Sequence, residues 1–204
     1  MNRWLTTRSA YGLLLAACCA PAAWLLWRGL SGGLGANPAE TLLKGTGLWT
    51  LRFLCLTLAV TPLRQWTPWT AVARWRRTLG VTTFVYATLH FLAYAWLDMG
   101  FDPDAVARDL AKRPFALVGF AAFVLLVPLA ATSFNAAIRR LGGVRWRRLH
   151  QLVHVVALLA LLHFFWLRAG KHRFDEVLLY SAIVALLFTA RWLKRRSAVR
   201  PAKA

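Results

Sequence analysis

Six long apolar stretches, each close to twenty residues, dominate this chain of 204 residues. Crossing the hydrocarbon core of a bilayer takes about 20 apolar residues in a helix, because lipid offers no partner for backbone N–H and C=O groups. Hydrophobic residues make up 59% of the chain, more apolar surface than a soluble chain of this length can bury. We therefore predict an all-α integral membrane protein, a bundle of six transmembrane helices in one domain over residues 1–204, with spans at about 9–27, 48–66, 80–97, 115–134, 149–167 and 174–192.

The basic residues predict the orientation of these spans. The chain has 26 Lys+Arg and 7 Asp+Glu, a net charge of +19. Positive residues concentrate on the cytoplasmic side of membrane proteins. Seventeen of the 26 lie in the N-terminus, the second and fourth loops and the tail, whereas all seven acids lie in the other loops. The imbalance indicates that both termini are cytoplasmic and explains the charge by topology rather than by nucleic-acid binding.

The N-terminus allows one alternative to a first membrane span. Leu15-Ala16-Ala17-Cys18 resembles a lipoprotein cleavage site, and cleavage would leave five spans with the new N-terminus outside. However, the apolar run continues to Trp27, beyond the length of a usual signal core. We expect the first span to be retained. Cys18, Cys19 and Cys55 have neither the spacing of a zinc site nor that of a disulfide framework.

Two histidines lie inside predicted spans at matching depth. His90 lies about 7 residues and His163 about 4 residues from the outer ends of their spans, or roughly 10 and 6 Å below the boundary. Ionisable groups inside a bilayer are costly and point to function. Two imidazoles on different helices can supply the two axial nitrogens of a haem iron. We predict His90 and His163 as these ligands; in the alternative, each forms only a hydrogen bond to a neighbouring helix.

His150 and His154 are candidates for an inner cofactor site. They lie one turn apart at the inner end of the fifth span, where headgroup contact and packing are the alternatives. On an ideal helix, His150 and His163 are rotated by about 140° from one another, so one face does not present both. An inner haem would also need a second ligand on the helix of His90, one level further in, and Arg76 and Arg77 stand at that position instead. These points favour one outer haem over two, unless a π-bulge interrupts the fifth span.

Several arginines are candidates for binding anionic groups of cofactors. Arg52, predicted at the outer end of the second span, could pair with a haem propionate, or it could reach lipid headgroups. The cytoplasmic loops could hold a flavin phosphate, although topology alone would also place arginines there; the candidates are Arg74, Arg76, Arg77, Arg145, Arg147 and Arg148. On the outer side, Asp102-Pro103-Asp104 predicts a short capped helix, a docking candidate or a solvated connection.

An ordered series of short motifs between residues 47 and 167 resembles the MsrQ (YedZ) family and, more distantly, ferric-reductase-like transmembrane domains. No single motif is specific, but their order along the chain is. The motifs are Gly47-Leu48-Trp49-Thr50-Leu51-Arg52, Thr61-Pro62-Leu63-Arg64, Arg76-Arg77-Thr78-Leu79-Gly80, Tyr86-Ala87-Thr88-Leu89-His90, Lys112-Arg113-Pro114-Phe115, Leu129-Ala130-Ala131-Thr132-Ser133, Trp146-Arg147-Arg148-Leu149-His150-Gln151-Leu152 and Leu162-His163-Phe164-Phe165-Trp166.

This resemblance implies a function in electron transfer across the bacterial inner membrane. It implies a b-type haem, a bound flavin mononucleotide (FMN), and electrons passing from the cytoplasm or the quinone pool to a periplasmic molybdenum-containing methionine-sulfoxide reductase. The haem-associated histidines of the family correspond to His90, His150 and His163. His154 departs from the family pattern, in which an aromatic residue is expected, and could substitute for His150 or compete with it.

A proton- or ion-coupled transporter that uses intramembrane histidines is the main alternative function. Against it, no carboxylate lies inside any predicted span, whereas proton pathways usually contain them. A self-contained metal reductase is disfavoured because the 12 residues after Trp192 are too few for a nicotinamide-binding domain. A scaffold without a cofactor is the fourth possibility. The number of haems, the electron donor and the oligomeric state stay open at this point.

Overall fold

The computed structural model describes residues 5, 7–169 and 174–199, and within these ranges the chain is helical and contains no strand. Six helical segments are long and apolar enough to cross a membrane, which confirms the predicted fold class. They are α1 (Arg8–Leu30), α2 (Pro38–Trp66), α3 (Trp75–Ala93) with its flanking turns η2 (Thr70–Arg74) and η3 (Tyr94–Asp98), α5 (Pro114–Ala131), α7 (Gly143–His150) continued by α8 (Leu152–Ala169), and α9 (Asp175–Val199). Two shorter helices, α4 (Pro103–Lys112) and α6 (Asn135–Leu141), connect the spans.

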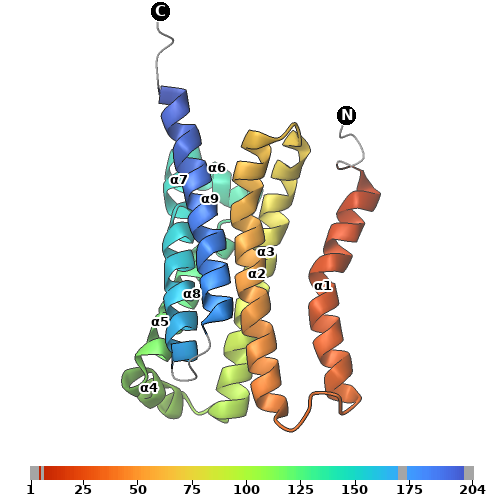
Figure 1. The fold of residues 1–204 in the computed structure, drawn as a ribbon, viewed down its shortest axis with the longest axis vertical. Helices are drawn as coiled ribbons and strands as arrows, with labels where there is room; N and C mark the ends of the chain where they lie inside the picture. Colours follow the sequence, from red (N-terminus) through yellow and green to blue (C-terminus); the bar gives the residue numbers. More distant parts are fainter. Residues whose placement is uncertain (1–4, 6, 170–173, 200–204) are drawn as a thin grey trace, which may run out of the picture.

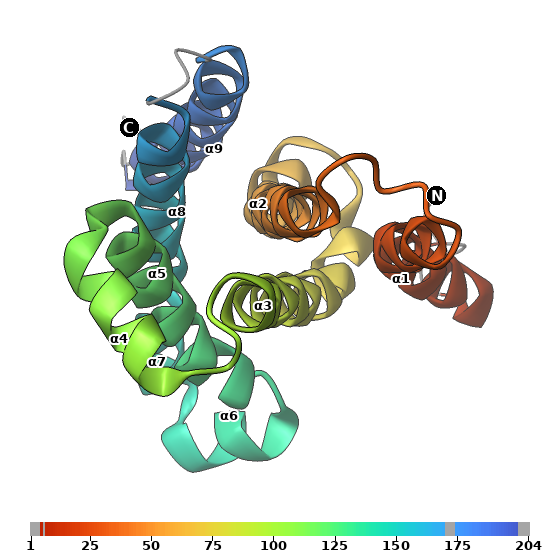
Figure 2. The same ribbon diagram turned by 90° about the horizontal axis from the view of Figure 1, so that it is seen from below.

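The spans form two groups that face one another across the centre of the molecule. Figure 2 shows α1, α2 and α3 on one side and α5, α8 and α9 on the other. In Figure 1, α1 begins and α9 ends at the same end of the bundle, and α4 lies at the opposite end. We call the end with α4 the outer end. Lys171, Arg173 and the tail beyond Val199, which contributed to the predicted orientation, lie outside the described residues.

Helix α2 begins ten residues earlier than its apolar run predicted. The side chain of Asn37 accepts a hydrogen bond from the backbone N–H of Glu40 at 3.0 Å, and Pro38 occupies the first helical turn. An N-cap residue followed by proline starts a helix whether or not the first turns are apolar. The first turns of α2 are polar, so the apolar run used for the prediction did not include them. Arg52 therefore lies fourteen residues into α2, and the prediction that placed it at the outer end of the span was wrong.

The fifth span is interrupted at Gln151, between α7 and α8. The N–H of Gln151 donates to the carbonyl of Arg148 at 3.1 Å, a tighter turn than the α-helical pattern. His150 lines one cavity of the molecule and His163 lines another. The expected rotation of about 140° between them assumed one unbroken helix, and the chain is interrupted between the two residues.

Polar side chains fix the start of α4 and the attachment of α1. Asp102 caps α4 by accepting from the N–H of Asp104 at 2.9 Å, with Pro103 next, which confirms the predicted short helix. Tyr86, buried in α3, ties α1 to the bundle: its hydroxyl donates to the Cys18 carbonyl and accepts from the Ala22 N–H, each at 2.9 Å. The hydroxyl is inserted beside Pro21, where the α1 hydrogen-bond ladder is already broken.

Candidate functional site

A cavity of about 530 Å³ lies between α2, α3, α5 and α8 in the outer half of the bundle. His90 of α3 and His163 of α8 line it from opposite helix groups, with their ring centroids 6.2 Å apart and their planes inclined by 71°. The structure therefore brings together the two histidines that the sequence placed at matching depth. Aromatic side chains form much of the remaining wall, among them Phe91, Phe120 and Phe123.

Both histidines are held by the same local arrangement. Nδ1 of His90 lies 3.1 Å from the Leu43 carbonyl of α2, and Nδ1 of His163 lies 2.7 Å from the Phe115 carbonyl of α5. A glycine follows each carbonyl by four residues, Gly47 and Gly119. A Cβ at Gly47 would stand 3.0 Å from the His90 ring, and one at Gly119 would stand 2.7 Å from His163. Each glycine thus leaves its imidazole the space to reach a helix carbonyl.

This arrangement fits a metal centre that requires two imidazole nitrogens. A backbone carbonyl only accepts, so each Nδ1 carries the proton and each Nε2 keeps its lone pair for a ligand. Metal-binding histidines are generally oriented in this way by a second hydrogen bond. Metal–nitrogen bonds are about 2.0–2.1 Å long, so rings 6.2 Å apart leave room for one metal ion between them. The apolar and aromatic walls suit the flat, largely apolar macrocycle of a haem.

Charged side chains of both signs surround the outer mouth of this cavity. The basic residues are Lys44, Arg113 and Arg168, and the acidic residues are Glu40, Asp98 and Asp109. Asp109 accepts from the Tyr94 hydroxyl at 2.8 Å and pairs with Arg113 at 3.1 Å, which ties α4 to η3 and to the start of α5. Arg168 pairs with Glu176 of α9. The mouth therefore offers cations close to the histidine pair.

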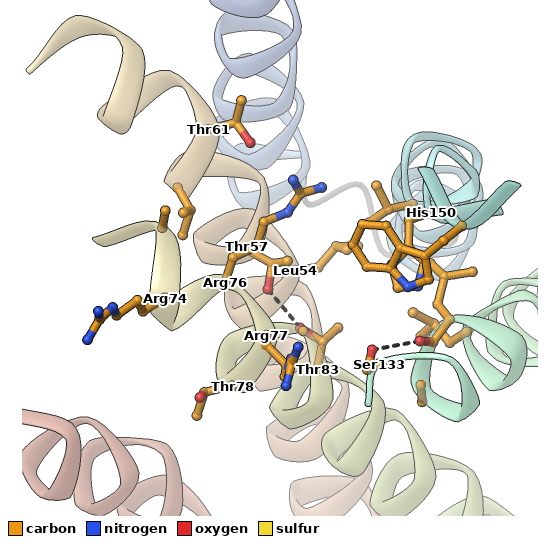
Figure 3. A pocket seen from close by; sticks show the side chains of 18 of the residues that line it. Leu54, Thr57, Thr61, Arg74, Arg76, Arg77, Thr78, Thr83, Ser133 and His150 are labelled. Carbon is orange, nitrogen blue, oxygen red and sulfur yellow. Dashed lines mark hydrogen bonds between the residues drawn. The ribbon is translucent and has the colours of Figure 1, made fainter. Parts of the chain in front are cut away.

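A second cavity, of about 640 Å³, lies in the inner half of the bundle. Arg64, Arg74, Arg76 and Arg77 line it, and no acidic residue is among the side chains that form its wall. Figure 3 shows Arg76 and Arg77 on one side and His150 on the other. Hydroxyl groups add further hydrogen-bonding capacity, including Thr61, Thr78 and Ser133. Such a wall suits an anionic ligand, because arginine binds phosphate and carboxylate with several donors.

His150 differs from the outer pair in which nitrogen the protein uses. Its Nε2 lies 3.0 Å from the Thr132 hydroxyl, and its ring stacks on Trp146 with centroids 4.1 Å apart. The Thr132 hydroxyl donates to the Pro128 carbonyl at 2.7 Å, so it accepts from the Nε2–H of His150. The Trp146 indole N–H is bound to the Thr132 carbonyl at 2.9 Å. His150 is therefore engaged by the protein at the nitrogen that the outer histidines leave available.

His154, the second candidate for an inner site, lies outside both cavity walls. Its Nδ1 lies 2.9 Å from the Gln151 carbonyl, and Arg191 of α9 donates to its Nε2 at 2.8 Å. Arg191 also donates to the Leu58 carbonyl of α2. That carbonyl has no helical partner because Pro62, four residues later, lacks an N–H. We therefore assign His154 to a network that joins α2, α8 and α9, and leave it out of the inner site.

Only some of the arginines predicted as cofactor contacts line a cavity. Arg74, Arg76 and Arg77 line the inner cavity, whereas Arg147 and Arg148 are exposed and line neither cavity. The Nε of Arg52 donates to the Tyr180 hydroxyl at 3.1 Å, and its guanidinium lies 4.6 Å from the Trp49 ring centroid. Arg52 therefore packs between α2 and α9 rather than against the outer cavity.

The two cavities lie end to end and share two lining residues. These are Leu54 of α2 and Leu126 of α5, which are 1% and 6% exposed. Both belong to the main hydrophobic core of the described chain. The boundary between the two cavities is therefore apolar.

Sequence reasoning missed the glycines that seat the outer histidines and the threonine that engages His150. A signal for the glycines was present, since Gly47 and Gly119 interrupt apolar helical stretches in which glycine costs about 1 kcal/mol relative to alanine. No comparable signal marked Thr132, because a threonine bonded to its own helix is common in membrane spans.

Comparisons with known proteins agree with this architecture. The family described as "Ferric reductase like transmembrane component" matches residues 46–161. The chain is 57% identical to the "Protein-methionine-sulfoxide reductase heme-binding subunit MsrQ" of Polaromonas naphthalenivorans, over 97% of this chain and 92% of that protein. It is 55% identical to the protein of the same name from Ralstonia nicotianae, over 79% and 75%, and 48% identical to that from Bordetella pertussis, over 92% of each. No solved structure matches the chain significantly.

Proposed function

The chain belongs to the ferric-reductase-like transmembrane family and, within it, to the MsrQ group; from this premise we propose that it is the haem-binding membrane subunit of a methionine-sulfoxide reductase system. In this proposal His90 and His163 hold the iron of a b-type haem in the outer cavity. The observation that carries it is the 6.2 Å separation of two imidazoles whose Nδ1 atoms both lie against helix carbonyls.

The roles of the surrounding residues follow from this geometry. The Leu43 and Phe115 carbonyls fix the ring tautomers, so each Nε2 is available as a ligand. A haem held there would supply a one-electron carrier, and His90 and His163 would each provide a ligand to its iron. Leu54 and Leu126 exclude water between the cavities, so the path between them carries electrons and not ions.

Optical spectra of the purified protein test the haem proposal. We expect a reduced low-spin b-type spectrum after dithionite in the wild type, and its loss in both His90→Ala and His163→Ala. His154→Gln is the matched control, because His154 lies outside the cavities, and it should keep the spectrum. A colourless preparation from haem-replete cells would contradict the proposal and favour the transporter or the scaffold.

An anionic electron carrier in the inner cavity completes the proposed path. We assign FMN to this cavity because the described part of its wall contains four arginines and no acid, so a phosphate would find several donors there. Arg76, which lies across the cavity from His150 (Figure 3), is the arginine that we choose to test. Acid release followed by fluorescence measures bound flavin, and a stoichiometry near zero would remove FMN from the proposal.

We further propose that electrons enter on the cytoplasmic side and leave on the periplasmic side of the bacterial inner membrane. A quinone or a cytoplasmic flavin reductase would be the donor, and a periplasmic molybdenum-containing methionine-sulfoxide reductase the acceptor. Helix α4 lies at the outer end, and Asp109 and Leu110 from it line the outer cavity, so the acceptor would dock there. Reporter fusions after Asp104 and at Ala204 should report periplasm and cytoplasm, respectively; the same compartment for both would contradict the topology.

A further inference from the structure

Arg168, near the end of α8, has a buried hydrogen-bond donor without a partner. One nitrogen of its guanidinium, Nη2, donates to Glu176 of α9, and the guanidinium carbon lies 5.3 Å from the Phe164 ring centroid. Its Nε is buried and has no hydrogen-bond partner among the described residues. Because a buried N–H without an acceptor costs free energy, this atom marks the place of a missing acceptor.

The position of Arg168 connects this donor with the histidine pair. Arg168 lines the outer cavity and follows His163 by five residues on the same helix, or about 7.5 Å of rise toward the outer end. Because both side chains line the same cavity, a ligand held at His163 would have Arg168 in the wall around it, on the side toward the outer end. A haem carries two carboxylates on one edge, and an arginine fork is the side chain best suited to bind a carboxylate.

The other cations near the outer cavity are less suitable. The Arg113 side chain is 54% exposed and its Nε is already paired with Asp109 at 3.1 Å. The Lys44 side chain is 47% exposed and pairs with Glu40 at 2.5 Å. Arg168 is only 16% exposed and retains a donor, so its interaction with a carboxylate would be screened least.

We propose that Arg168 binds a carboxylate of the haem in the outer cavity through its Nε, while Glu176 holds the guanidinium in place. This inference rests on the proposed function, because it takes haem as the ligand of His90 and His163. It assigns to Arg168 the role that the sequence suggested for Arg52.

A chemical double-mutant cycle tests the contact directly. The full-length chain, purified from haem-deficient cells, is loaded with either haem or haem dimethyl ester, which has no free carboxylate, and the affinity of each is measured. Charge-assisted hydrogen bonds make haem bind the wild type about 10- to 100-fold more tightly than the ester. In Arg168→Gln we expect haem to bind about 10- to 100-fold more weakly and the difference between haem and ester to be largely lost.

Two control variants separate this contact from general damage. Glu176→Gln removes the charge of the ion pair but keeps an amide oxygen that can still accept from Nη2 of Arg168, so most of the preference for haem over its ester should remain. Arg52→Gln removes an arginine that faces Tyr180 and should also retain that preference. An undiminished preference in Arg168→Gln, or its loss in Arg52→Gln instead, would overturn the assignment. Failure of the wild type to bind either porphyrin would instead contradict the proposed function.

Discussion

The outer and inner cavities use histidine in opposite ways. In the outer cavity, helix carbonyls engage Nδ1 of His90 and His163, and glycines at the same helix turns leave space for the rings. In the inner cavity, Thr132 engages Nε2 of His150, and Trp146 covers one face of its ring. The hydrogen bond that the protein makes to one ring nitrogen decides which nitrogen of each histidine remains for a ligand.

The two cavities also differ in the charged residues that line them. Among the described residues, four arginines and no acidic residue line the inner cavity, whereas the outer mouth has side chains of both signs. An inner ligand would therefore be bound mainly by its charge, and an outer ligand mainly by coordination and apolar contact. Variants that exchange or remove these features test the contrast.

The largest effect is expected when an outer imidazole is removed. His163→Gly should abolish the low-spin haem spectrum, and added imidazole should restore it by entering the space left by the side chain. His150→Gly should leave the spectrum of the outer haem in place, since Thr132 already engages Nε2 of His150. Titration with imidazole, followed optically, measures both. A full spectrum in His163→Gly without imidazole would show that another residue is the ligand.

The space that Gly119 leaves for the His163 ring is tested by adding one methyl group. In Gly119→Ala the new Cβ would lie 2.7 Å from Nδ1 of His163, closer than van der Waals contact allows. Overpacking typically costs about 1–3 kcal/mol, so we expect about 5- to 150-fold weaker haem binding.

Gly80→Ala is the matched control for this substitution. Its Cβ would meet only a Thr57 methyl group at 3.7 Å, an ordinary contact, and alanine favours the helix. Haem binding should be unchanged. Equal losses of haem affinity in Gly119→Ala and Gly80→Ala would contradict the inference that Gly119 leaves space for the His163 ring.

The charge of the inner wall is tested at Arg76. Arg76→Gln should weaken FMN binding by about 10- to 100-fold, because a charge-assisted hydrogen bond to phosphate is lost. The wild-type affinity should also fall as salt rises. Fluorescence titration measures both effects. Arg147→Gln is the control, since Arg147 is exposed and lines neither cavity. A larger loss of FMN affinity in Arg147→Gln than in Arg76→Gln would indicate that the phosphate binds at the fourth loop instead.

The smallest effect is expected at the hydroxyl that engages His150. Thr132→Val leaves the Nε2–H of His150 without its acceptor, which costs about 1–3 kcal/mol. For a chain of this size, each kcal/mol lowers the melting temperature by about 2–4 °C. The outer haem spectrum should not change. In the control, Thr88→Val, the hydroxyl bonds only to the Phe84 carbonyl of its own helix, so less stability should be lost. Equal melting temperatures of Thr132→Val and Thr88→Val would contradict the hydrogen bond between Thr132 and His150.

Local features of the sequence were sufficient for the fold class and for part of the site. Apolar length defined six spans, because a helix in lipid must satisfy its own backbone. Counting residues from the span ends placed His90 and His163 at one depth, because helix rise per residue is constant. The cap at Asp102 and Pro103 was also readable, since capping depends on only four adjacent residues.

Which polar groups contact one another depends on how the helices pack. Arg52 faces Tyr180 of α9, although Leu51 and Leu54 beside it line the outer cavity, and Arg168 shares that cavity wall with His163. Arg191 of α9 donates both to His154 and to the Leu58 carbonyl, which Pro62 leaves without a helical partner. Such pairings depend on helix rotation and packing over long sequence separations. Periodicity along one chain records how a helix faces lipid, but not which neighbour it meets.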